Sequence, residues 1–128
     1  MPVQWTISKP HQLVIAVARD ELRLRDVEEY LDGVTVADAL AYRKIFDTTN
    51  ATMMLSDADM MALGARIRAY LKVSKLGPLA IVAVTERAYQ QAMLFEVLAE
   101  GDRPVKIFRE LHHAREWLDG FGEATSLP

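Results

Sequence analysis

Residues 42–71 read YRKIFDTTNATMMLSDADMMALGARIRAYL and combine a short strand, a polar loop and a helix. The strand is predicted over Tyr42–Asp47, and the helix is predicted to begin at Ser56. Ser56 and Asp59 have the spacing of a capping box, in which each side chain accepts a hydrogen bond from the other residue's backbone amide. In an α/β domain, ligands and partners commonly bind where a strand leads through a loop into the next helix. This stretch therefore indicates the fold class and the first place to look for function.

Unbroken apolar runs predict the centre of a sheet. Leu13–Ala18 (LVIAVA) and Leu79–Val84 (LAIVAV) have strand length and are typical of strands buried on both faces. Further strands are predicted over Val3–Ser8 and Val105–Phe108, and apolar residues at helical spacing predict helices that begin near residues 24, 57, 86 and 111. The resulting order, β-β-α-β-α-β-α-β-α, indicates an α/β fold with a mixed, mostly parallel sheet of about five strands covered by about four helices.

Length and composition limit the classes of protein. The 128-residue chain fits one domain, which we expect to span residues 1–121 and to be followed by a flexible tail over 122–128. A net charge of -3 gives no general attraction to nucleic acid or to anionic membranes. The absence of cysteine excludes disulfides and thiolate-bound metals. Without a signal-peptide pattern or an apolar run of about 18 residues, we expect a cytoplasmic protein with no integral membrane association.

Three segments resemble the SpoIIAA-like proteins of the STAS-like family. They are ELRLRDVEEYL at residues 21–31, LAIVAVT at 79–85 with the following AYQQAMLFE, and VKIFRELHHAREWL at 105–118. The resemblance extends from roughly Val3 to Phe121 and implies a single STAS-like domain. It also implies a noncatalytic bacterial regulatory or protein-interaction module, because the best understood members are anti-sigma factor antagonists.

The phosphorylated motif of that family is not reproduced here. In the family, a strand that ends in Asp leads to a helix that begins DSSGL, and a kinase phosphorylates one Ser. Asp47 matches the end of the strand, but Asp57 occupies the position of the phosphorylated Ser and Ser56 that of the preceding Asp. Asp57 would thus place a permanent negative charge on the surface where relatives carry a phosphate.

Polar residues around this helix start form the predicted partner surface. Several of them should lie beyond the carboxyl ends of neighbouring central strands, where a crevice is expected. The alternative is that they only cap helices and shape turns. The candidate partner-binding residues are Asp47, Thr48, Thr49, Asn50, Ser56, Asp57, Asp59 and Thr85.

The predicted helix over residues 86–100 is apolar around most of its circumference. Its Ala88 and Ala92 suit tight packing on a sheet, whereas Met93, Leu94 and Val97 point away from that face. We therefore expect these three side chains to be covered by a second chain, as in a homodimer, or to face a ligand.

The alternative function is a carrier or sensor that binds a small apolar or lipid-like ligand between the sheet and the helices. The resemblance is compatible with this alternative, because related members resemble lipid-binding Sec14-like domains in topology. An enzyme is not expected, since the sequence shows no nucleophile and base at a recognisable spacing and no Gly-rich phosphate loop. Neither cofactor nor metal is expected. His112 and His113 point about 100° apart on a helix and do not easily share one ion, even with His11 as a third ligand.

Overall fold

The computed structural model describes the backbone of residues 2–126 and the side chains of residues 2–121. Within the described residues, five strands form one sheet in the order β1-β2-β3-β4-β5. The strands are β1 (Val3–Ser8), β2 (Leu13–Leu22), β3 (Arg43–Met53), β4 (Leu79–Val82) and β5 (Val105–Phe108). β1 is antiparallel to β2 and the remaining neighbours are parallel, so the predicted mixed, mostly parallel sheet is confirmed.

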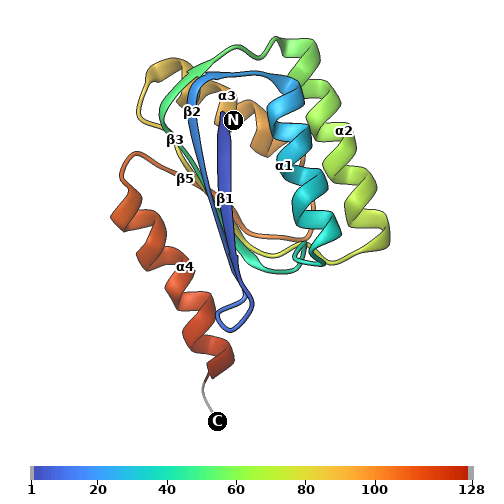
Figure 1. Cartoon of the computed structure of the whole chain (residues 1–128), viewed down its shortest axis with the longest axis vertical. Coiled ribbons are helices and arrows are strands. Elements are labelled where there is room, and N and C mark those ends of the chain that lie inside the picture. The colour runs from blue at the N-terminus through green and yellow to red at the C-terminus, as the bar shows by residue number, and fades with distance from the viewer. Residues whose placement is uncertain (1, 127–128) are drawn as a thin grey trace.

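Helices cover both faces of the sheet unequally. The described helices are α1 (Leu24–Val36), α2 (Asp57–Val73), α3 (Glu86–Leu98) and α4 (Leu111–Ser126). α1, α2 and α3 pack on one face, called the three-helix face below, and α4 packs on the other (Figure 1). The three helices share a face because successive parallel strands are sheet neighbours and their crossovers are right-handed. The side chains of β3 alternate between the two faces of the sheet. Ile45 packs against α4, and Phe46 packs against Tyr30 of α1.

β2 and β3 extend beyond the other strands. The predicted loop after Asp47 is wrong, because β3 continues to Met53 and pairs with β2 from Arg19↔Asn50 to Leu22↔Met53. β4 accompanies β3 only as far as Asp47↔Val82, and the part of β3 beyond this point carries exposed polar residues such as Thr49 and Asn50. Backbone pairing with β2 holds it as a strand, and a bulge between Val17 and Arg19 shifts the register.

Two glycines allow close packing within helices. A Cβ atom at Gly33 would lie 2.4 Å from the Trp5 ring, so α1 continues through this glycine while the indole of β1 packs against it. A Cβ atom at Gly64 would lie 2.7 Å from the Leu98 Cβ atom, so α2 and α3 approach each other closely at this position. Both glycines are needed for contact and not to end a helix.

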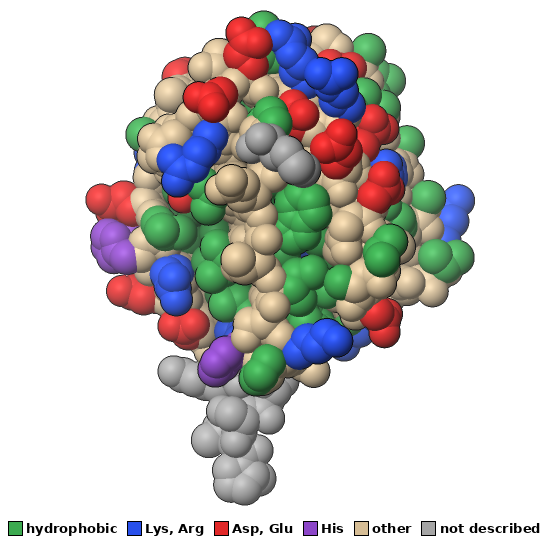
Figure 2. All heavy atoms as spheres, viewed as in Figure 1, with side chains coloured by type: hydrophobic (Ala, Val, Ile, Leu, Met, Phe, Trp, Pro, Cys, Tyr) green, Lys and Arg blue, Asp and Glu red, His purple; other side chains and the backbone are tan. Residues whose placement is uncertain are grey.

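The β1 edge of the sheet faces the viewer in Figure 1, and Figure 2 shows the same face with all atoms. Hydrophobic side chains gather in the middle of this face, whereas acidic and basic side chains lie mostly around it (Figure 2). Trp5 of β1 belongs to the apolar layer, with its ring 5.7 Å from that of Tyr30. The apolar layer under α1 therefore reaches the surface at the β1 edge.

No helix of the described residues is both long and apolar enough to span a membrane. α4 extends to Ser126, and the side chains after Phe121 together with residues 127–128 lie outside the described residues. The flexible tail over 122–128 stays a prediction.

Candidate functional site

The start of α2 has the predicted capping box. Ser56 Oγ accepts a hydrogen bond from the Asp59 amide at 3.1 Å, and Asp59 Oδ2 accepts one from the Ser56 amide at 2.9 Å. Thr85 caps α3 in the same way, accepting from the Ala88 amide at 3.1 Å. These three side chains satisfy backbone donors of their own helices, which accounts for their positions without a partner.

The residues after Asp47 also bond within the chain. Asp47 Oδ1 accepts hydrogen bonds from the Thr49 amide at 2.9 Å and from the Thr49 hydroxyl at 2.5 Å. Thr48 does not belong to the predicted partner surface, because it is buried and its hydroxyl donates to Val82 O at 2.7 Å, which joins β3 to β4. Asn50 and Asp57 are exposed. Binding of a partner to the remaining residues stays a prediction.

Only part of the predicted dimer patch on α3 is exposed. Met93 and Val97 are 50% and 69% exposed. Leu94 is partly buried and packs against the core cluster under α1 and α2, so it does not extend the exposed patch. The apolar surface that α3 offers to a second chain is therefore smaller than the sequence suggests.

The two adjacent histidines lie closer together than their helical spacing suggests. Possible ligand atoms of Glu110, His112 and His113 all lie within 4.8 Å of one another, and His113 Nδ1 is 3.2 Å from Glu110 Oε2. All three side chains are exposed at the start of α4. When the histidines are protonated, ion pairs with Glu110 account for this arrangement.

A cavity of about 100 Å³ lies between the three-helix face of the sheet and α1, α2 and α3. Its walls are almost entirely apolar and include Phe46 of β3, Met60 of α2 and Ala92 of α3. Apolar residues of these helices recur at helical spacing and turn inward, but they leave this space between them. Protein interiors contain few voids larger than a water molecule, so a cavity of this size is a candidate ligand site.

The polar side chains of the cavity lie toward its two ends. Lys44 and Thr48 of β3 share the three-helix face with Phe46, because side chains alternate along a strand. Because these two positions are four residues apart in an extended strand, their Cα atoms are about 13 Å apart. Lys44 lies near the amino ends of β3, β4 and β5, together with Arg103 from the loop before β5, whereas Thr48 lies toward the carboxyl ends with Gln91 of α3.

Several buried polar atoms at the cavity keep unused hydrogen-bonding capacity. Lys44 Nζ donates to Leu40 O and, at 2.8 Å, to Tyr42 O, which uses two of its three hydrogens. Arg103 Nη1 is 3.5 Å from Gly77 O, at the limit of a hydrogen bond. In the part of the chain that the structure describes, the buried atoms Tyr30 Oη, Arg103 Nε and Gln91 Oε1 have no hydrogen-bond partner.

Burial is the main cause of the shifted pKa values of Lys44, Arg103 and Tyr30. Burial, with a further contribution from the positive charge of Arg103, lowers the pKa of Lys44 to about 7. Burial lowers the pKa of Arg103 to about 10 and raises the pKa of Tyr30. The charge of Arg103 has a smaller, lowering effect on the pKa of both Lys44 and Tyr30, and all three residues line the cavity. None of the described residues that line the cavity is acidic.

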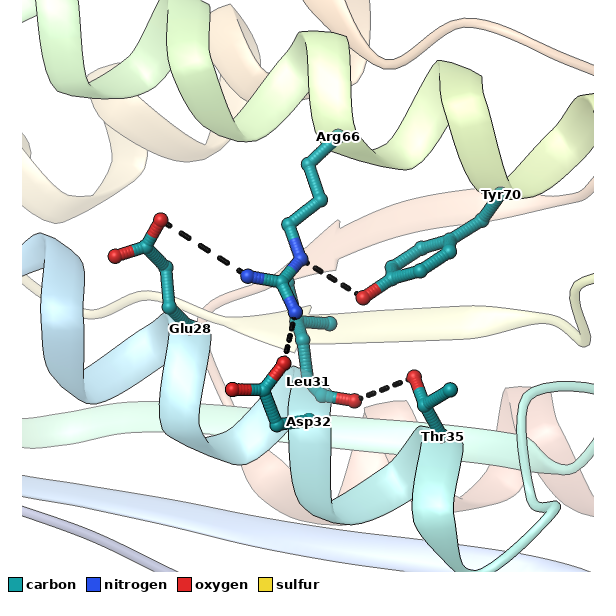
Figure 3. Close-up of polar contacts among 6 residues, drawn as sticks. All are labelled: Glu28, Leu31, Asp32, Thr35, Arg66 and Tyr70. Atoms are coloured by element: carbon teal, nitrogen blue, oxygen red, sulfur yellow. Dashed lines mark hydrogen bonds and ion pairs between the residues drawn. The ribbon is translucent and has the colours of Figure 1, made fainter.

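An arginine on the outside of the cavity wall connects α1 to α2. Arg66 of α2 donates to Asp32 of α1 and lies 3.9 Å from Glu28 Oε2, while its Nε donates to Tyr70 Oη at 2.8 Å (Figure 3). The pKa of Arg66 is raised despite partial burial, because Tyr70 and Asp32 accept its hydrogen bonds. Both helices carry cavity-lining residues on their inner faces, so this contact helps to hold the wall together.

Lys44 and Arg103 lie at the end of the sheet opposite the predicted partner surface. The sequence pattern predicted a site after the carboxyl ends of the strands, and Lys44, Arg103 and Tyr30 were not among the predicted residues. The signal for Lys44 was present in YRKIFD, where period-2 alternation puts Lys44 and Phe46 on one face of the strand. A charged residue on a strand face that also carries an aromatic residue is unusual enough to mark a position for inspection.

Comparisons with known proteins bear on the fold. No protein-family model matches the chain, and no curated protein matches it either. Among solved structures, the chain is similar to an uncharacterized protein of the DUF3478 family with a SpoIIAA-like fold from Shewanella loihica PV-4. The two share 19% sequence identity with a TM-score of 0.61, over 91% of this chain and 93% of that one. At this identity the likeness shows the fold alone, and the predicted fold is confirmed: this chain is an α/β domain with a SpoIIAA-like fold.

Proposed function

We propose that this protein is a noncatalytic binding module, a sensor or carrier that holds a small apolar ligand between the sheet and helices α1 to α3. The observation that carries the proposal is the apolar cavity of about 100 Å³ in the interior. An engineered cavity of roughly 150 Å³ binds benzene, so the ligand should be about that size or smaller. Met53 and Met60 line the cavity, and their flexible side chains can adjust to its shape.

The side chains at the cavity favour binding over catalysis. Tyr30 and Thr48 supply the hydroxyl groups among the described lining residues, and the Thr48 hydroxyl already donates to Val82 O. His, Asp and Glu are absent from that part of the lining, so neither hydroxyl has a carboxylate or imidazole base beside it. A module that binds without reacting fits this arrangement.

A neutral probe tests the proposal. Benzene titrated into isotope-labelled protein should shift the methyl resonances of residues such as Ile67 and Ile81, which line the cavity. Ala92→Leu should abolish these shifts by filling the space, whereas Ala65→Leu on the exposed face of α2 should leave them unchanged. Equal shifts in wild type and Ala92→Leu would place the binding elsewhere, and no saturable shift in wild type would remove the proposal.

Association with a protein is a second candidate function. The exposed Met93 and Val97 on α3 support it, and symmetric homodimers are the commonest soluble assemblies. Light scattering on wild type and Val97→Asp tests this candidate. A wild-type dimer that dissociates in the variant supports a homodimer through this patch. A monomeric wild type contradicts the homodimer, and a variant that stays dimeric removes the patch as its interface.

A further inference from the structure

Two cationic side chains are buried at the same end of the apolar cavity. Lys44 is 4% exposed and Arg103 is 9% exposed. Within the described residues, neither takes part in an ion pair, and no carboxylate lines the cavity to balance them. A buried charge without a counter-charge destabilises a fold, and native proteins pair such charges or bind an ion. This end of the cavity therefore attracts an anion.

The unused hydrogen-bonding capacity supports the same conclusion independently. Tyr30 Oη and Arg103 Nε are buried and have no acceptor among the described residues. Lys44 has one ammonium hydrogen left after donating to the carbonyls of Leu40 and Tyr42. Three donors from α1, β3 and the loop before β5 thus line the same apolar space, with Lys44 and Arg103 at one end and Tyr30 beside Phe46. A carboxylate is an acceptor with two oxygens and about four lone-pair positions, and it suits such a set.

We infer that the cavity binds a small monocarboxylic acid, with its carboxylate held by Lys44, Arg103 and Tyr30 and its hydrocarbon part lying along Phe46 toward Ala92. The inference rests on the function proposed above and names its ligand class. The size of the cavity limits the whole ligand, carboxylate included, to about the size of benzene. A phosphate group fits less well, because it is larger, more strongly hydrated and dianionic near neutral pH.

The experiment compares pentanoate with its neutral isostere pentanamide by calorimetry at pH 6.5. Pentanoate should bind about tenfold more tightly or better, because charge-assisted hydrogen bonds are roughly twice as strong as neutral ones. Tyr30→Phe keeps the shape of the ring and should reduce this preference severalfold. Arg103→Met should reduce it further, whereas Lys106→Met, at an exposed cation of β5, should leave it unchanged.

A second measurement needs no variant. Lys44, Arg103 and Tyr30 are the titratable groups among the described residues that face the cavity, and only Lys44 has a pKa near neutrality. The affinity for pentanoate should therefore fall between pH 7 and 9, by up to tenfold per pH unit, while the affinity for pentanamide stays constant. Pentanoate itself remains ionised throughout.

The outcomes separate this inference from the proposed function. If benzene binds in the cavity but pentanoate and pentanamide bind equally, the proposed function stands and the carboxylate inference is overturned. The same holds if benzene binds and pentanoate does not. If none of the three probes binds, both proposals fail. Preference for pentanoate that persists unchanged in Tyr30→Phe and Arg103→Met would place the anion elsewhere and overturn the inference.

Discussion

Replacing Lys44 by Met is expected to remove most of the pH dependence of stability between pH 7 and 9.5. Burial lowers the pKa of this lysine from its ordinary value of 10.5 to about 7 in the folded protein. Between these values, the unfolded state binds one more proton than the folded state. The free energy of unfolding of the wild type must therefore rise with pH in this window.

The size of the effect follows from the two pKa values. Each pH unit can add about 1.4 kcal/mol to the free energy of unfolding while unfolded Lys44 is protonated and folded Lys44 is not. Integrated from pH 7 to 9.5, the rise is roughly 3 kcal/mol. Arg103 contributes mainly above its pKa of about 10, and the raised pKa of Tyr30 lowers stability only above the ordinary tyrosine range. The window therefore isolates Lys44.

Urea unfolding followed by circular dichroism at half-unit pH steps measures this effect. Lys44→Met should show a nearly flat profile, although it also leaves the carbonyls of Leu40 and Tyr42 without their donor and so shifts the whole curve. Lys75→Met, at an exposed lysine, is the control and should keep the wild-type slope. A flat wild-type profile, or the same slope in wild type and Lys44→Met, would contradict a lowered pKa of Lys44 in the folded protein.

Three further substitutions test the packing and the caps. Ala92→Leu should leave the free energy of unfolding unchanged or raise it by up to about 1 kcal/mol, because it fills the cavity. Ala80→Leu lies in the fully buried layer under α4 and should lower the free energy of unfolding by about 1–3 kcal/mol. Similar losses of stability in both variants would argue against the cavity. Ser56→Ala should cost about 1 kcal/mol through the lost cap of α2, and an unchanged urea midpoint would contradict that role. Gly64→Ala should lower the melting temperature because its Cβ atom would lie 2.7 Å from a Cβ atom of α3. Gly120→Ala should raise it slightly, because an added Cβ atom there meets no contact within 4 Å among the described residues. The reverse order would contradict the close helix contact.

Local signals predicted much of the fold. The apolar runs at Leu13–Ala18 and Leu79–Val84 mark β2 and β4, because central parallel strands need apolar side chains on both faces. The capping box of Ser56 and Asp59 involves residues three apart, so the sequence alone defines it. Such features depend on neighbours in the chain and can be read before the fold is known.

Features that depend on distant partners were not predicted. The polar extension of β3 through Thr48 and Asn50 is a strand because β2 pairs with it, and nothing within its own pattern indicates this. The cavity depends on how three helices meet over β3 and β4. Lys44 could have been placed on the three-helix face by alternation, but a lysine at a strand end commonly extends to solvent, and only the packing shows that this one is buried.

The most direct test of the account is a crystal structure of the protein with 4-bromobutanoate, an analogue of pentanoate in which bromine replaces the terminal methyl group. We expect an anomalous bromine peak inside the cavity near Phe46 and Ala92. We also expect the carboxylate within roughly 2.7–3.2 Å of Arg103 Nε and Tyr30 Oη. A bromine peak only on the surface, or an unchanged cavity at saturating ligand concentration, would contradict the claim that this domain binds a small carboxylic acid in its interior.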